Sequence, residues 1–267
     1  MIMKTGLVLG GGAVRGLAHI GVLKVFERNG IKIDRIAGTS MGGVIGGLYA
    51  AGVPAEAIED KILNTPKYRL LDMGIRHRGL LAGKAVHQVI NELLQQHSTQ
   101  GVLIEQLPME FKAIAVDLMC GQQVVLDHGD LGTALRATTA FPGVFAPLMD
   151  GDRMLVDGGV LNNLPVEEAL DDGEACYIIA VDVAREHEKK PPRNMIEVVY
   201  RSYGLMAAGR RHVSLKQADY VIRPEVGYYA SFDFTKAEEC IKAGEEAAER
   251  CLAEIRQRIE LEQSRVV

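Results

Sequence analysis

A serine flanked by glycines is the first feature of this sequence that could do chemistry. Residues 38–42 read Gly-Thr-Ser-Met-Gly, a G-x-S-x-G pattern between a partly apolar run and a helix-like stretch rich in glycine and alanine. On a sharp turn from a strand into a helix, a serine hydroxyl is exposed and the helix N-terminal amides point toward it. A Cβ at Gly38 or Gly42 would collide across such a turn. The pattern therefore predicts that Ser40 is a nucleophile.

A second glycine-rich segment, residues 10–16, reads GGGAVRG and lies between a strand-like run and a helix-like run. It lacks the Lys-Ser/Thr ending of a P-loop, its last glycine falls one place late for a dinucleotide fingerprint, and no ribose-binding acid ends the next strand. Consecutive glycines can instead turn backbone amides toward an oxyanion, and Gly11 and Gly12 are the best donor candidates. Arg15 would either brace this loop or meet a substrate phosphate, and bracing is the favoured interpretation.

A serine nucleophile needs a base, and the histidines of this chain are poorly placed to supply one. His187 lies in a charged stretch and His212 follows two arginines in a helical pattern. Only one strand precedes the elbow, whereas several do in triad hydrolases of the α/β-hydrolase type. Asp157 differs, because it follows a short strand pattern and opens into Gly158 and Gly159. A base at a strand end and an ordinary Asp-Gly turn are both open interpretations.

The elements that must position these residues alternate between strand and helix patterns. Uniformly apolar strands alternating with helices predict an α/β fold of three layers (α/β/α) with a mainly parallel central sheet. The predicted strands are 5–9, 31–37, 111–118, 122–126, 154–156, 177–183 and 220–223, and the predicted helices include 16–29, 41–52, 195–216 and 236–263. The third and fourth strands form a predicted hairpin, and the helix at 195–216 contains two glycines, Gly204 and Gly209, that could interrupt it. We expect one domain over residues 1–267, with the helix at 236–263 docked on it.

Bulk properties narrow the class of protein. The net charge of −5 argues against a nucleic-acid partner, and the four cysteines have no metal-ligand spacing. Neither a signal peptide nor a membrane-spanning run is recognisable, so we expect a cytoplasmic protein, with peripheral contact at the inner membrane face left open. The basic and apolar stretch Lys67–Lys84 suits a mobile lid at an anionic membrane surface, although a solvated basic loop is the commoner alternative. The oligomeric state is not predicted.

Four motifs occur together and in order: GGGAVRG, GTSMG, residues 137–147 (ATTAFPGVFAP), and Asp157-Gly158-Gly159. In this combination the chain resembles the patatin-like phospholipases, in their compact stand-alone bacterial form, over nearly its whole length. The resemblance implies a Ser–Asp dyad in which Ser40 is the nucleophile and Asp157 the general base. It also implies an oxyanion loop at Gly11 and Gly12 with Arg15 at its basic position. Where the family's glycine run continues, this chain has Ala13.

The resemblance further implies that Asn162 braces the Asp157 loop, and that the substrate is a fatty acyl ester of a lipid, cleaved without metal or cofactor. Partial burial beside Ser40 would have to raise the basicity of Asp157, because an exposed carboxylate is a weak base. Two alternatives stay open. The same acyl-enzyme could serve an acyltransferase, or the protein could be a catalytically idle lipid-binding regulator.

Overall fold

A computed structural model describes residues 3–66, 84–97, 102–170, 176–184, 191–192 and 195–265. The predicted lid at Lys67–Lys84 therefore lies outside the described residues, apart from Lys84, which begins a helix. Within the described ranges, no helix has the length and apolar character needed to cross a membrane.

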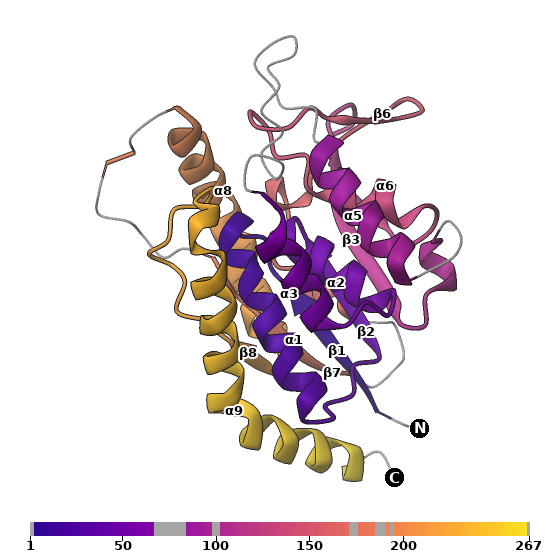
Figure 1. Ribbon diagram of the computed structural model, residues 1–267, viewed down its shortest axis with the longest axis vertical. Coiled ribbons are helices and arrows are strands. Elements are labelled where there is room, and N and C mark those ends of the chain that lie inside the picture. Colours follow the sequence, from indigo (N-terminus) through magenta and orange to yellow (C-terminus); the bar gives the residue numbers. More distant parts are fainter. Residues whose placement is uncertain are drawn as a thin grey trace.

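A single sheet runs through the described part of the molecule (Figure 1). Its strands are β1 (Lys4–Leu9), β2 (Arg35–Thr39), β3 (Glu110–Asp117), β4 (Gln122–Leu126), β5 (Leu148–Asp150), β6 (Arg153–Asp157), β7 (Cys176–Val181) and β8 (Tyr220–Ile222). The strand order is β5-β6-β3-β2-β1-β7-β8, with β4 also paired to β3. The pairs that join β8, β7, β1, β2 and β3 are parallel, whereas β4, β5 and β6 are added antiparallel. The predicted mainly parallel sheet and the β3–β4 hairpin are confirmed.

Helices cover both faces of this sheet. The helices are α1 (Ala18–Arg28), α2 (Met41–Ala50), α3 (Ala55–Asn64), α5 (Lys84–His97), α6 (Leu131–Thr138), α7 (Val166–Ala169), α8 (Met195–Gln217) and α9 (Ala237–Arg265). One core cluster joins the sheet to α1, α2, α3 and α9, and a second cluster joins its other face to α7 and α8. The predicted three-layer α/β/α architecture is therefore confirmed.

Strand β1 shows why the sequence reads as continuously apolar. Successive side chains of a strand point to opposite faces. Leu7 and Leu9 belong to the first core cluster, and Val8 belongs to the second. Since both faces of the strand are buried, both sets of positions must be apolar.

Helix α9 packs along α1, side by side with it in Figure 1. The two helices approach so closely that a Cβ at Gly244 would lie 1.9 Å from the carbonyl oxygen of Ala18. Ion pairs from Lys24 to Glu245 and to Glu59 join α1 to α9 and to α3. The apolar stripe of α9 is buried at Cys240, Ala247 and Ile255.

The second strand and the first helix begin elsewhere than predicted, and a short strand, β5, was missed. The second strand begins at Arg35 rather than at residue 31, because Asp34 turns its carboxylate to the Thr5 amide and residues 31–34 form no ladder. The first helix begins as a 3-10 turn (Ala13–Leu17) before α1. Neither Gly204 nor Gly209 interrupts α8, which runs unbroken from Met195 to Gln217.

Candidate active site

The elbow at Ser40 has the predicted geometry. Ser40 lies between β2 and α2 and adopts a φ of 55°, a left-handed conformation that is strained for a residue with a Cβ. A Cβ at Gly42 would lie 2.1 Å from the carbonyl oxygen of Leu9, and one at Gly38 would lie 2.6 Å from that of Gly42. The predicted collision across the turn is confirmed for Gly38, whereas Gly42 is required because the end of β1 lies against it.

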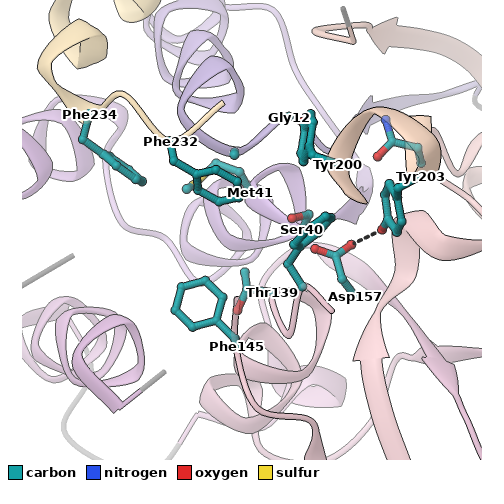
Figure 2. Close-up of a pocket in the computed structure, with 13 residues that line it drawn as sticks. Gly12, Ser40, Met41, Thr139, Phe145, Asp157, Tyr200, Tyr203, Phe232 and Phe234 are labelled. Carbon is teal, nitrogen blue, oxygen red and sulfur yellow. Dashed lines mark hydrogen bonds between the residues drawn. The ribbon is translucent and has the colours of Figure 1, made fainter. Parts of the chain in front are cut away.

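Strand β3 brings Asp157 to this elbow. In the ladder, Ile114 pairs with Thr39 at the end of β2, and the next residue, Ala115, pairs with Asp157 at the end of β6. Two strands that run in opposite directions therefore finish beside each other on one edge of β3. The nucleophile candidate follows the end of the first strand, and the base candidate ends the second, so the two side chains meet (Figure 2).

Asp157 is buried, with 1% of its surface exposed. Its Oδ1 accepts hydrogen bonds from the Gly159 amide at 2.9 Å and from the Tyr203 hydroxyl at 3.1 Å (Figure 2). Burial raises the pKa of Asp157 to about 6, and hydrogen bonding by Ser40, Gly159 and Tyr203 partly offsets that rise. A carboxyl group with such a pKa is a stronger base than an exposed one, and it is still ionised at neutral pH.

The glycine loop presents a different set of amides from the one that the sequence predicted. The Gly11 amide donates to the carbonyl oxygen of Asn163 at 3.0 Å, so it is not free to meet an oxyanion. The amides of Gly12 and Ala13 make no hydrogen bond within the described part of the chain, and both residues line the pocket that contains Ser40. Ala13 has a φ of 50°, so an alanine adopts a conformation that favours glycine. We therefore replace Gly11 by Ala13 as the second donor candidate.

Arg15 and His19 hold this loop from behind. Arg15 is buried, donates from Nε to the Gly12 carbonyl at 3.4 Å and from Nη2 to the Tyr200 hydroxyl at 2.6 Å. His19 Nε2 is 2.7 Å from the Gly10 carbonyl, and burial lowers its pKa to about 4, so the ring is neutral and donates. Of the two interpretations of Arg15, these contacts match the bracing role.

The segment after Asp157 is packed against the elbow. A Cβ at Gly158 would lie 2.3 Å from the Ile114 carbonyl oxygen, so only glycine fits this approach. Among the described residues, Asn162 makes no hydrogen bond to Ser40 or Asp157: its side-chain Nδ2 donates to Glu168 at 2.9 Å, and its backbone carbonyl accepts from the Thr39 hydroxyl at 2.9 Å. These contacts tie the Asp157 loop to β2 and α7, as a bracing residue would.

Aromatic side chains wall the pocket. It is lined by Gly12, Ala13, Ser40, Met41, Thr139, Phe141, Phe145, Asp157, Asn163, Tyr200, Tyr203, Phe232 and Phe234. The Phe141 ring contacts those of Tyr203, Tyr200 and Phe232 at centroid distances of 5.0, 5.4 and 6.1 Å. The pocket thus surrounds the Ser40 hydroxyl and the Asp157 carboxylate with mainly aromatic side chains, which suits an acyl chain next to an ester.

Sequence reasoning missed Asn163, Tyr200 and Tyr203. Asn163 donates from its side chain to the Gly11 carbonyl at 3.0 Å. The two tyrosines come from α8, where their spacing of three residues is equally typical of core packing, so no local signal distinguished them. Only the adjacency of Asn163 to the predicted brace Asn162 could have indicated its place.

Comparisons with known proteins point to one family. Residues 7–170 match the family described as "Patatin-like phospholipase". An uncharacterised NTE family protein of Mycobacterium tuberculosis is 39% identical over 165 residues, covering 61% of this chain and 44% of that protein. A second from the same organism is 30% identical over 278 residues, covering 92% and 46%. The lysophospholipase NTE1 of Debaryomyces hansenii is 28% identical over 281 residues, covering 93% and 18%. The chain spans less than half the length of these curated relatives.

Solved structures share the fold at low identity. VipD from Legionella pneumophila has a TM-score of 0.61 at 15% identity, covering 94% of this chain and 67% of that one. ExoU of Pseudomonas aeruginosa, solved in complex with SpcU, has a TM-score of 0.50 at 16% identity, covering 92% and 53%. At such identities the likeness concerns the fold alone. Because the family match covers more than half of the chain, including the elbow and Asp157, the chain belongs to the patatin-like phospholipase family.

Proposed function

We propose that the protein is a serine acyl hydrolase that cleaves fatty acyl esters of lipids through a Ser40–Asp157 dyad. The observation that carries this proposal is the buried carboxylate beside a serine on a strained elbow, within an aromatic-walled pocket. Membership of a phospholipase family and similarity to a lysophospholipase support the lipid ester as the substrate class.

The first half-reaction forms an acyl-enzyme. Ser40 Oγ attacks the ester carbonyl carbon while Asp157 takes the hydroxyl proton, and the carbonyl oxygen becomes an oxyanion. The amides of Gly12 and Ala13 are the proposed donors to it, and such a donor contributes about 3 kcal/mol of barrier lowering. When the tetrahedral intermediate collapses, the bond to the alcohol breaks and the protonated Asp157 returns its proton to the leaving oxygen.

The second half-reaction releases the fatty acid. Asp157 takes a proton from a water molecule, and the water oxygen attacks the acyl carbon of the Ser40 ester. Collapse of this second intermediate restores the Ser40 hydroxyl with the proton held by Asp157. No metal or cofactor takes part in the proposed steps.

Labelling with a fluorophosphonate ester tests this proposal. We expect a covalent adduct that mass mapping assigns to Ser40, and no adduct in Ser40→Ala. An unlabelled wild-type protein that is folded would refute an acyl-enzyme and leave the lipid-binding alternative. Product analysis with an added alcohol or thiol acceptor separates a hydrolase from an acyltransferase, because the lining of the pocket fits both.

A cytoplasmic location with peripheral contact at the inner membrane face remains a prediction.

A further inference from the structure

The general-base candidate is held by a helix that belongs to none of the four motifs. Asp157 Oδ1 has two donors, the Gly159 amide of its own loop and the Tyr203 hydroxyl of α8. The other carboxylate oxygen is turned toward Ser40 (Figure 2). The two carboxylate oxygens therefore have different surroundings. Oδ1 accepts from two donors, one of which comes from α8, and the other oxygen faces Ser40.

The hydroxyl of Tyr203 is fixed in place by its neighbours. Its ring makes an edge contact with Phe141 at 5.0 Å. A Cβ on residue 159 would lie 2.6 Å from the Tyr203 hydroxyl oxygen, so Gly159 leaves the room through which this hydroxyl reaches the carboxylate. The second glycine after Asp157 is therefore required by a side chain of α8.

One turn earlier, α8 also holds the oxyanion loop. The Tyr200 hydroxyl accepts a hydrogen bond from Arg15 at 2.6 Å, and the Arg15 guanidinium lies 5.6 Å from the centre of the Tyr200 ring. Arg15 in turn contacts the Gly12 carbonyl. Two hydroxyls three residues apart on one helix therefore contact the two halves of the site.

We infer that Tyr203 is a positioning residue for the general base: it occupies Oδ1 of Asp157 and leaves Oδ2 as the oxygen that takes the proton of Ser40. This inference deepens the proposed function and rests on it. Tyr200 has the corresponding role for the oxyanion loop, through Arg15.

The protonation states are consistent with this role. Burial and the neighbouring Asp157 carboxylate raise the pKa of Tyr203 well above its ordinary value, so the phenol keeps its proton and donates it in the hydrogen bond. The side chains that hydrogen-bond to the carboxylate are those of Ser40 at the elbow and Tyr203 on α8, and β3 pairs the apolar Ala115 with Asp157. Tyr200, which accepts a hydrogen bond from Arg15, also raises the pKa of Tyr203.

Tyr203→Phe is the test, because it keeps the ring and removes only the hydroxyl. Without this donor, ionised Asp157 is less stable and its pKa rises further. We expect the acidic limb of the kcat/KM profile for a soluble ester to move to higher pH by about one pH unit. Activity would therefore fall about tenfold at pH values below the limb and recover toward the wild-type rate above it.

Tyr200→Phe is the matched control, since it removes a hydroxyl one turn away that does not contact Asp157. We expect it to lower kcat without moving the limb. An unmoved limb in a folded Tyr203→Phe protein, or an equal movement in both variants, would overturn the inference. Ser40→Ala, measured in parallel, reports on the dyad itself: if it keeps wild-type turnover, the proposed function fails whatever the tyrosine variants do.

Discussion

The elbow and helix α8 both line the pocket, but they disclose their roles in different ways. At the elbow, Gly38, Ser40 and Gly42 fall within five consecutive residues; Gly38 and Ser40 have reasons within the turn itself, and Gly42 makes room for the end of β1. On α8, Tyr200 and Tyr203 occupy ordinary inward-facing positions of a helix with no motif. The comparison teaches that a strained nucleophile leaves a mark on its own sequence, whereas the side chains that orient its base do not.

The largest effect should come from the elbow. Ser40→Ala removes the attacking oxygen, so we expect ester turnover to fall at least about a thousandfold, compared with about tenfold for Tyr203→Phe below the acidic limb. Initial rates on a soluble ester measure both variants. If Tyr203→Phe costs as much as Ser40→Ala at all pH values, the distinction between a reacting group and a positioning group is lost.

Asp157→Asn should change activity and stability in opposite directions. We expect a loss of about a thousandfold in turnover, because the amide cannot take the serine proton. The pKa of Asp157 is raised in the folded protein from 3.8 to about 6. Ionisation is thus harder in the folded state than in the unfolded state, and stability is lost as the pH rises through this range. The asparagine does not ionise, so the variant should be more stable at pH 7, by up to about 3 kcal/mol.

Thermal melting at pH 4 and pH 7 measures this change in stability. The difference between Asp157→Asn and the wild-type protein should be small at pH 4 and should favour the variant at pH 7. A variant that is less stable at pH 7, with the fold retained, would show that the carboxylate is not strained by burial. In that case only the strained backbone at Ser40, and not the burial of Asp157, would lower the stability of the fold for the sake of the site.

The smallest effect should come from Ala13→Gly. Ala13 holds a φ of 50°, and glycine adopts this region without strain, so we expect a gain in stability of at most about 1 kcal/mol and activity within about threefold of wild type. Chemical denaturation and ester hydrolysis measure these effects. Gly12→Ala is the contrasting variant, because its Cβ would lie 2.7 Å from a methyl carbon of Val183. If the two exchanges affect turnover equally, the free amides of this loop are not the proposed oxyanion donors.

Local rules explain what the sequence could predict. Alternating apolar strands and helices indicated the three-layer α/β/α fold, and Ser40 with its glycines followed from the geometry of one turn. The errors arose where a residue far away in the chain forms a hydrogen bond with a backbone amide. Asp34 contacts Thr5 on β1 and shortens β2. The Gly11 amide is taken by the carbonyl of Asn163, a partner 152 residues away in the chain. Helix α8 runs continuously through Gly204 and Gly209, where the glycines had indicated a possible interruption.

The sequence by itself determined the order of the elements and the elbow, because each depends on a few neighbouring residues. Asp157 was predicted as the base only through the family resemblance, since its own neighbours fit an ordinary Asp-Gly turn equally well. Only the tertiary structure decided that Ser40 and Asp157 meet. The register of β3 sets Ile114 opposite Thr39 and Ala115 opposite Asp157, which brings the ends of β2 and β6 together. Burial at that junction, rather than any feature of the Asp-Gly-Gly segment, raises the pKa of Asp157. Proton affinity and the choice of Tyr203 as a partner depend on what surrounds a side chain in space, and no local pattern encodes that environment.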